Sequence, residues 1–468
     1  MQAPDYTLNP PPIANYPTNT SEKPTGERFS YKPHFRDWWA LLLYILTISA
    51  FFIVLGLNLY KLNFSSFSNS DFLSVSNDTY IISLVGGIIL SLVLSAVYLI
   101  APGLLIRLSY WFNVVLYLCL GLFLLSTYSN PLNLIIGILM LVTAVIYVFL
   151  WFSWRNLIPF STLMLRNITK FILKHPSAIM LSFSFLIIGF LFYSVWLFTL
   201  MSVLFNYSNE GCEGYTCNQV GLWFLIVFLV FVVYWTSQLL KDILHLAVSG
   251  TFASDYFFPG REKYPIFKSL SRALSTSLGS ACFGSLLIAI VQSLRSLASF
   301  ARGTDNGIII FVGCCLECLL ATFEGLLAYF NTYAYTYCAM YGQSYLQAGK
   351  STWNLVKDRG IEAIINDSLI GNVLNLGSFI VGGLSSLLAI IVIVIQVPQW
   401  QFNYGFILVI LINWTLGKLI FGLVSSVIYS CNITFFVCLA EDPEALRNNN
   451  PDLYEKIRTQ YPQVEHSV

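Results

Sequence analysis

Ten long apolar runs, joined by short polar connectors, occupy the chain from Trp38 to about Cys438. A helix needs roughly 20 apolar residues to cross the hydrocarbon core of a bilayer. Inside hydrocarbon every backbone N–H and C=O must be paired within the protein, which a helix achieves within its own segment. The sequence therefore predicts an all-α polytopic integral membrane protein. Its ten expected crossings are 38–60, 79–101, 109–127, 132–152, 178–204, 220–244, 276–298, 316–340, 370–397 and 405–430.

Composition leaves little room for a water-soluble domain. Only 10% of the residues are charged and 57% are apolar, whereas about a quarter of an average soluble domain is charged. The segment 1–37 carries seven prolines and no apolar run, which predicts a disordered cytoplasmic tail. Residues 38–440 are expected to form one transmembrane domain of about ten helices. Residues 441–468 are expected to form a polar cytoplasmic tail with at most a short helical stretch.

The positions of the basic residues predict the orientation. An even number of crossings places both termini on one side, and 20 of the 24 lysines and arginines fall in the tails and loops of that side. The opposite side holds only Lys61 and Arg302, while Arg295 and Lys418 lie within apolar runs. Cationic loops are retained in the cytoplasm, so both termini are predicted to be cytoplasmic. The net charge of +1 and the absence of a basic stripe argue against a nucleic-acid partner.

The expected outer loops carry possible modification sites. Asn63, Asn77 and Asn206 each begin a glycosylation sequon. Cys212 and Cys217 lie in the same outer loop as Asn206, at a spacing that can close a small disulfide in an oxidising compartment. Two free thiols are the alternative, because spacing alone does not decide connectivity.

The stretch from Gly307 to Met340 leaves the topology open. As one helix its 34 residues would be about 51 Å long, which is too long for a simple crossing. We therefore expect it to be tilted, broken or partly re-entrant. If 276–298 and 316–340 both entered the membrane without crossing it, eight crossings would remain and the termini would stay on the same side. We prefer the interpretation with ten crossings.

The sequence contains no recognisable catalytic or metal-binding motif. The four histidines form no metal-binding spacing, and no pair of cysteines in a Cys-x-x-Cys motif lies beside one. There is no glycine-rich phosphate loop and no Gly-x-Ser-x-Gly elbow. We therefore expect neither an enzyme nor a protein with a cofactor or metal.

Ionisable residues within the apolar runs are the remaining polar signal. Each costs roughly 2.5–3.5 kcal/mol to insert, so such groups tend to line cavities or to pair with each other. Glu324, in the eighth run, is the strongest candidate for a polar cavity, because it precedes the most polar and aromatic stretch of the chain. The others are Asp242, His245, Arg295, Glu317 and Lys418.

That polar and aromatic stretch runs from Phe330 to Tyr345. Its tyrosines recur every four residues from position 333, so they share one side of a helix. Tyrosines near the membrane boundary usually anchor a helix there, but Tyr333 and Tyr335 are expected to lie deeper, with Asn331 beside them. We predict that these three residues face a substrate cavity.

The sixth run adds a second aromatic and polar cluster, formed by Tyr234, Trp235 and Gln238, and Trp196 of the fifth run is expected to oppose it. Aromatic faces with few formal charges suit a quaternary ammonium ion, because the ring quadrupole attracts a cation that cannot donate hydrogen bonds. Ordinary aromatic packing is the alternative. The predicted substrate-binding residues are Trp196, Tyr234, Trp235, Gln238, Glu324, Asn331, Tyr333 and Tyr335.

Three segments resemble the choline transporter-like family. They are HLAVSGTFASDYFF at 245–258, NTYAY at 331–335 with MYGQSY at 340–345, and FFVCLAEDPE at 435–444. The short loop expected at 61–78 is closer to the fungal and protist branch than to animal members, which usually have a large glycosylated loop there. The resemblance implies a multi-pass solute carrier of the plasma membrane, with organelle membranes as an alternative, and places Asn331, Ala334 and Tyr335 on the shared segment.

The expected function is the transport of choline or a related small organic cation by alternating access, through a cavity between the fifth, sixth and eighth crossings. The expected partners are this substrate and membrane lipids. A non-transporting scaffold or lipid-handling protein, and a channel, are the alternatives.

Overall fold

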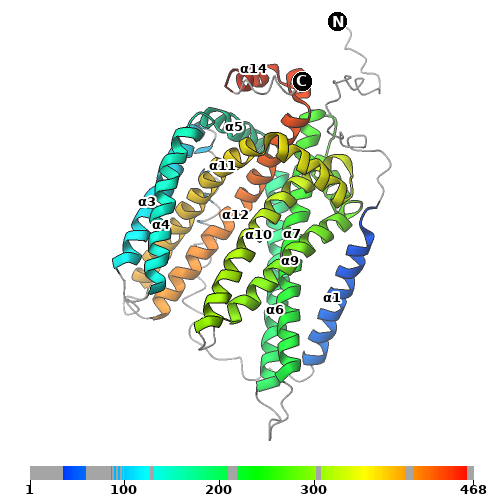
Figure 1. Cartoon of the computed structure of the whole chain (residues 1–468). Helices are drawn as coiled ribbons and strands as arrows, with labels where there is room; N and C mark the ends of the chain where they lie inside the picture. Colours follow the sequence, from blue (N-terminus) through cyan, green and yellow to red (C-terminus); the bar gives the residue numbers. More distant parts are fainter. Residues whose placement is uncertain are drawn as a thin grey trace.

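A computed structural model describes residues 35–59, 101–126, 131–208, 219–301, 307–396 and 404–460, with parts of 86–100. These residues form a helical bundle without strands (Figure 1). Its helices are α1 (Trp38–Leu59), α3 (Pro102–Ser126), α4 (Pro131–Trp154), α5 (Ile158–Lys174), α6 (Ser177–Ser208), α7 (Gln219–Phe257), α8 (Pro265–Leu274), α9 (Leu278–Ala301), α10 (Gly307–Tyr341), α11 (Tyr345–Gln396), α12 (Tyr404–Glu441), α13 (Pro443–Asn449) and α14 (Pro451–Gln460).

Nine helices in the described part of the chain are long and apolar enough to cross a membrane. They correspond to nine of the ten expected crossings; most of the second, 79–101, lies outside the described residues, as do Asn63, Asn77, Cys212 and Cys217. Asn206 lies at the end of α6. The prediction of an all-α polytopic membrane protein is therefore confirmed.

The two segments whose topology was open, 276–298 and 316–340, correspond to two long unbroken helices. The 24-residue α9 and the 35-residue α10 pack side by side, and both contain a candidate span. The apolar part of α10 reaches from Val312 to Tyr341. The structure therefore shows no break in α10 at Glu317 or Glu324, and neither helix has the interrupted form of a re-entrant segment.

Segments expected to be loops are helical as well. Helix α5 has apolar residues at three- and four-residue spacings on its buried face, among them Met164, Leu165 and Ile168, while Arg166 lies on the exposed face. This amphipathic pattern stabilises a helix that packs on the bundle without crossing it. Helix α11 begins 19 residues before its candidate span at Ile364 and runs over the upper end of the bundle before descending beside α12 (Figure 1).

The last part of the chain packs against the bundle. Helices α13 and α14 replace the single short helical stretch that was expected at most, and Leu446, Tyr454 and Ile457 are buried. The Asn449 side-chain amide donates hydrogen bonds to the carbonyls of Tyr256 and Phe257, at 2.8 and 3.2 Å. These are carbonyls at the end of α7, where no intrahelical donor remains. The C-terminal helices therefore cap α7.

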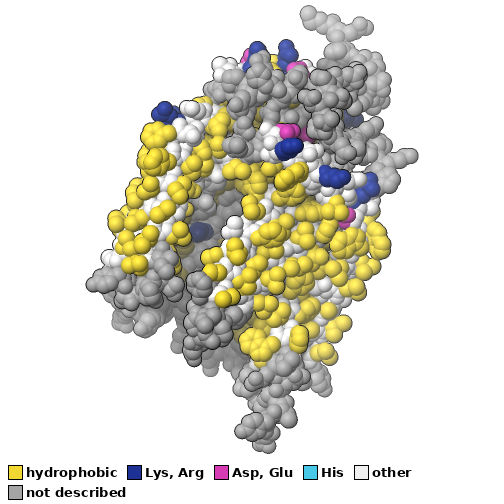
Figure 2. Space-filling view, in the orientation of Figure 1, with side chains coloured by type: hydrophobic (Ala, Val, Ile, Leu, Met, Phe, Trp, Pro, Cys, Tyr) yellow, Lys and Arg dark blue, Asp and Glu magenta, His cyan; other side chains and the backbone are white. Residues whose placement is uncertain are grey.

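The outside of the bundle is apolar, as a bilayer requires. Leucine, isoleucine and phenylalanine side chains of α1, α3, α4 and α6 are widely exposed. Figure 2 shows this hydrophobic surface over the sides of the bundle, with most of the visible charged side chains toward the end where α14 lies. The exterior thus has the character of a lipid-facing surface.

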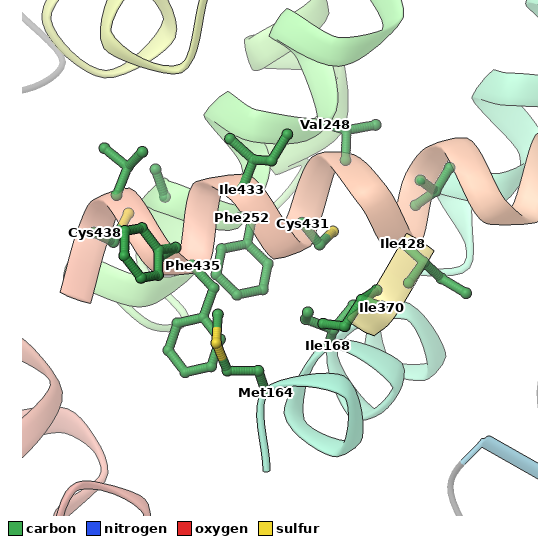
Figure 3. Packing of buried hydrophobic residues seen from close by; sticks show 14 of the residues in the cluster. Met164, Ile168, Val248, Phe252, Ile370, Ile428, Cys431, Ile433, Phe435 and Cys438 are labelled. Atoms are coloured by element: carbon green, nitrogen blue, oxygen red, sulfur yellow. The ribbon is translucent and has the colours of Figure 1, made fainter. Parts of the chain in front are cut away.

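The core lies toward the end of the bundle that carries α13 and α14, here called the inner end. Three helices are buried there on all sides, over residues 242–254 of α7, 333–338 of α10 and 430–439 of α12. Figure 3 shows part of this packing, with Met164 of α5 and Phe252 of α7 beside Phe435 of α12. In contrast, much of α10 between Val312 and Leu326 is exposed. The inner halves of these helices are therefore packed much more tightly than the outer halves.

The start of α1 is joined to this inner end through Asp37. Its carboxylate accepts hydrogen bonds from the Ser280 hydroxyl, at 2.7 Å, and from the backbone N–H of Tyr345, at 2.8 Å. Tyr345 is the first residue of α11, so Asp37 satisfies a free N–H at a helix N-terminus, where negative charge is favoured. Gly279 makes the contact possible, since a Cβ there would lie 2.2 Å from the Arg36 carbonyl oxygen.

We predict that Gly279→Ala destabilises the protein by about 1–3 kcal/mol, because the added methyl must displace the backbone of the α1 entry. The measurement is thermal unfolding of the purified protein in detergent. The control is Gly325→Ala, where nothing lies within 4 Å of the new Cβ and a helical alanine gains up to about 1 kcal/mol. Equal unfolding temperatures for the two variants would contradict the packing described here.

Candidate functional site

One face of α7 carries an indole, an amide and a carboxylate in succession. Trp235, Gln238 and Asp242 are three to four residues apart, so their side chains project from the same side of the helix. The Gln238 amide donates to the Asp242 carboxylate at 2.9 Å. The Trp235 N–H is directed at α9, at 3.2 Å from the Cys282 carbonyl and 3.1 Å from the Ser285 hydroxyl. Together with Asn331 and Tyr335 of α10, these residues are called the Asp242 cluster below.

Tyr335 joins α10 to this face. Its hydroxyl lies 3.0 Å from Asp242 Oδ2 and 3.2 Å from the Ala281 carbonyl. A small residue on α9 admits the ring, because a Cβ at Gly284 would lie 2.1 Å from the Tyr335 hydroxyl oxygen. The close approach of α9 and α10 at this point therefore depends on glycine.

Asn331 of α10 completes the cluster and is bound by Tyr345 of α11. The Asn331 amide donates to the Gly284 carbonyl at 3.0 Å, and its oxygen accepts from the Tyr345 hydroxyl. Burial raises the pKa of the Tyr345 phenol above its usual range, so the hydroxyl keeps its proton and acts as a donor. Tyr345 thereby links the cluster to Asp37, which caps its backbone N–H.

Aromatic rings surround the cluster on three helices. Tyr44 of α1 and Phe231 of α7 lie 5.2 and 5.4 Å from the Trp235 ring, and Tyr345 lies 6.1 Å from the Tyr335 ring. These are ordinary distances for aromatic contacts. The cluster therefore combines one carboxylate, two amides and several aromatic faces.

Three of the five side chains of the Asp242 cluster are closed to water in this conformation, whereas Gln238 is partly exposed. Trp235 has no exposed surface, and Tyr335 and Asn331 are each 1% exposed. A side chain without accessible surface touches neither solvent nor an internal void of water size. A solute reaches these residues only if the helices around them separate.

A small cleft opens on the outer side of the cluster. It lies between the outer halves of α7 and α9, has a volume of about 10 Å³, and is lined by residues that include Trp223, Val230 and Ser296. This space is close to that of a single water molecule. Tyr234 lies at this level, with its hydroxyl 2.7 Å from that of Ser296.

His245 of α7 is a buried histidine that contacts both α10 and α12. His245 Nδ1 lies 2.9 Å from the Ser430 hydroxyl, and Nε2 lies 2.9 Å from the Thr332 carbonyl. A carbonyl only accepts, so Nε2 carries a hydrogen and Nδ1 accepts from Ser430 in the neutral ring. His245 therefore connects α7 to α10 and α12 within the membrane.

A second carboxylate lies on the far side of α10. Asp367 of α11 accepts from the Tyr333 hydroxyl and from the Asn432 amide, both at 2.6 Å. The Asn366 amide donates to Asn432 Oδ1 at 3.0 Å, and the Ser161 hydroxyl of α5 donates to Asn366 Oδ1 at 2.8 Å. These five residues, called the Asp367 network below, join α5, α10, α11 and α12.

The predicted site residues therefore separate into groups. Trp235, Gln238, Asn331 and Tyr335 come together in the Asp242 cluster, whereas Tyr333 belongs to the Asp367 network. Tyr335 and Tyr333 point to different sides of α10 because they are two residues apart on a helix.

The other three predicted residues lie elsewhere. Tyr234 contacts α9 near the outer cleft. Glu324 accepts from Gln292 at 2.8 Å and pairs with Arg295 at 2.9 Å, between the outer halves of α9 and α10. Trp196 does not oppose Trp235: its N–H donates to the Leu229 carbonyl at 2.8 Å in a separate apolar cluster of α1, α6 and α7. Helix α6 thus does not contact the Asp242 cluster among the described hydrogen bonds. Helix α9 and the first residue of α11 contact it instead.

Sequence reasoning missed Asp367 and Tyr345 as site residues. Both lie at the edges of 341–369, which was interpreted as a loop because of its charged residues. The apolar spacing that begins at Ile364 marks Asp367 as part of a membrane helix and was the signal that could have identified it.

The fold defines a polytopic membrane protein with buried polar clusters in its helices. A family model described as plasma-membrane choline transporter matches residues 138–444. Protein PNS1 from Mycosarcoma maydis is 34% identical over 95% of this chain and 86% of its own length. Protein PNS1 from Gibberella zeae is 31% identical, over 96% and 87%. A CTL-like protein from Dictyostelium discoideum is 31% identical, over 70% and 57%.

The chain therefore belongs to the choline transporter-like family, as the three sequence segments indicated. This membership identifies a multi-pass membrane protein of a transporter family, and it favours a small-molecule substrate over an enzymatic reaction.

We predict that Tyr345→Phe lowers the stability of the folded protein by about 1–3 kcal/mol, because it leaves the buried Asn331 oxygen without a donor. Thermal unfolding in detergent measures the change. Tyr264→Phe is the control, since Tyr264 is 60% exposed and its substitution is expected to change stability by less than about 0.5 kcal/mol. If Tyr345→Phe were as stable as this control, the hydrogen bond between Tyr345 and Asn331 would be contradicted.

Proposed function

We propose that the protein transports choline or a closely related small organic cation across a membrane, and that the Asp242 cluster is its substrate site. The observation that carries this proposal is a buried carboxylate surrounded by aromatic rings at membrane depth. Family membership supports transport as the class of activity.

The chemistry of the cluster suits a quaternary ammonium ion. Such an ion donates no hydrogen bonds through its nitrogen, so it is recognised by charge and by aromatic faces. Asp242 supplies a carboxylate that carries one negative charge when ionised. Trp235 supplies a ring two turns away on α7, and Tyr335 of α10 supplies another, with its hydroxyl 3.0 Å from Asp242. The Gln238 and Asn331 amides offer hydrogen-bond partners for a hydroxyl group such as that of choline.

The uneven packing of the bundle supports alternating access. The inner halves of α7, α10 and α12 are tightly buried, while the outer halves are looser and a small cleft lies on the outer side of the cluster. We infer that this conformation is closed toward the inner end. Transport then requires α9 and the α10–α11 corner to move away from α7, which would break the Tyr335–Asp242 contact.

Charge distribution supports a cytoplasmic inner end, and the family supports the plasma membrane as the location. The alternatives are a channel and a scaffold or lipid-handling protein. A channel would need an open polar path, whereas Trp235, Asn331 and Tyr335 of the Asp242 cluster have almost no exposed surface.

The test is uptake of radiolabelled choline into proteoliposomes that contain the purified protein. We expect saturable uptake by the wild type. Asp242→Asn should raise the half-saturation concentration by roughly tenfold, which corresponds to about 1.4 kcal/mol of lost substrate binding. Trp235→Ala and Tyr335→Ala should abolish saturable uptake.

Two exposed residues provide matched controls. Trp353→Ala and Tyr264→Ala remove the same side chains from positions that are 64% and 60% exposed, and both should leave uptake unchanged. Unfolding temperatures of all variants separate loss of binding from loss of fold. Wild-type uptake that rises linearly with choline indicates a channel, and no uptake of choline or related cations indicates a scaffold. Normal uptake by the Trp235 and Tyr335 variants would contradict the assignment of the Asp242 cluster as the substrate site.

A further inference from the structure

We infer that the Asp367 network is a second, separate site, which takes up one small monovalent cation, a proton or sodium. A role for this cation in driving transport rests on the function proposed above, whereas the cation site itself does not.

The network is centred on a buried carboxyl group. Asp367 is 6% exposed and lies within the candidate span of α11. All its contacts are with neutral side chains, and no lysine or arginine in the described part of the chain pairs with it. An uncompensated carboxylate is costly at membrane depth, so such groups characteristically mark ion or proton pathways.

Every element around Asp367 presents an uncharged polar group. Helix α10 contributes Tyr333 and Tyr329, α12 contributes Asn432 and Tyr429, and α5 reaches the network through Ser161. The titratable groups that face Asp367 are thus three tyrosines, which are neutral at physiological pH. Taking up one positive charge would neutralise the site, because no other charged group faces it.

The surrounding oxygens suit a small cation and not an organic one. Hydroxyl, amide and carboxylate oxygens come from Ser161, Tyr333, Asn366, Asp367 and Asn432. The Tyr329 hydroxyl is also buried and has no hydrogen bond of normal geometry among the described residues, although its ring lies only 5.0 Å from that of Tyr333. Oxygen-rich sites bind hard cations. No tryptophan is present in the network, unlike in the Asp242 cluster.

The positions of Asp242 and Asp367 on two sides of α10 would allow substrate binding and cation binding to influence each other. Each accepts one tyrosine hydroxyl from α10 and one side-chain amide, Asp242 on one side of the helix and Asp367 on the other. His245 bonds to α10 between them. A shift of α10 that releases Tyr335 from Asp242 would therefore also move Tyr333 relative to Asp367, so that the two sites are linked through one rigid helix.

The test is the unfolding temperature of the purified wild-type protein, because a cation that binds only the folded state raises it. One arm titrates NaCl against N-methylglucamine chloride at fixed pH and ionic strength. The other lowers the pH at fixed sodium. We expect a rise on the order of 2–4 °C in one arm, which identifies the cation as sodium or proton. Asp367→Asn should abolish this rise.

Two further variants keep the test decisive. Tyr333→Phe removes a donor from the carboxylate but keeps its charge. A proton should then bind more tightly, with the midpoint moved to higher pH, whereas sodium would lose one oxygen ligand and its midpoint should move to higher sodium. If Asp367→Asn does not fold, the shifted midpoint of Tyr333→Phe still tests whether the cation binds in the Asp367 network. The matched control is Asp242→Asn, which should retain the rise.

The outcomes are distinct. No cation dependence in the wild type, an unchanged dependence in Asp367→Asn, or an unmoved midpoint in Tyr333→Phe would each show that the network only holds four helices together. Loss of the dependence in Asp242→Asn alone would place the cation at the other carboxylate. Because the measurement uses no substrate, a protein that fails to transport choline can still confirm the cation site.

Discussion

The exclusion of water from the membrane interior governs this structure, because each polar side chain at that depth must find a partner inside the protein. Helix α10 carries several such groups. Its inner half sends Asn331 and Tyr335 to α9 and α7, Thr332 to His245, and Tyr333 to Asp367. These bonds point in different directions around one helix, so they fix the neighbours of α10 on every side. The tight packing of the inner half follows from this requirement as much as from apolar contact.

Much of the fold was predictable from the sequence, since crossing a bilayer imposes a length and a composition that single segments display. The same holds for individual site residues. Trp235, Asn331 and Tyr335 were identified because polar and aromatic side chains at membrane depth need a reason to be there, and all three are central to the Asp242 cluster. Their type and depth can be read along one helix without knowledge of the partner.

The partners themselves were not predictable, because they depend on how helices turn toward each other. Trp196 was expected to face Trp235, but its N–H finds the Leu229 carbonyl instead. Glu324 was expected to face an aqueous cavity, but Arg295 and Gln292 of the neighbouring helix satisfy its carboxylate. Asp367 was hidden by the charged segment before it, since α11 continues through 345–363 as a helix where charge density suggested a loop.

The contacts of Asn449 with the end of α7 give the C-terminal residues a structural role that their polar composition conceals. A chain shortened before residue 443 would leave the last carbonyls of α7 open to water and uncover the apolar surfaces on which Leu446 and Ile457 rest. A purification tag is therefore best fused beyond residue 460, and an antibody raised against α14 would recognise a folded surface of the transporter and not a loose peptide.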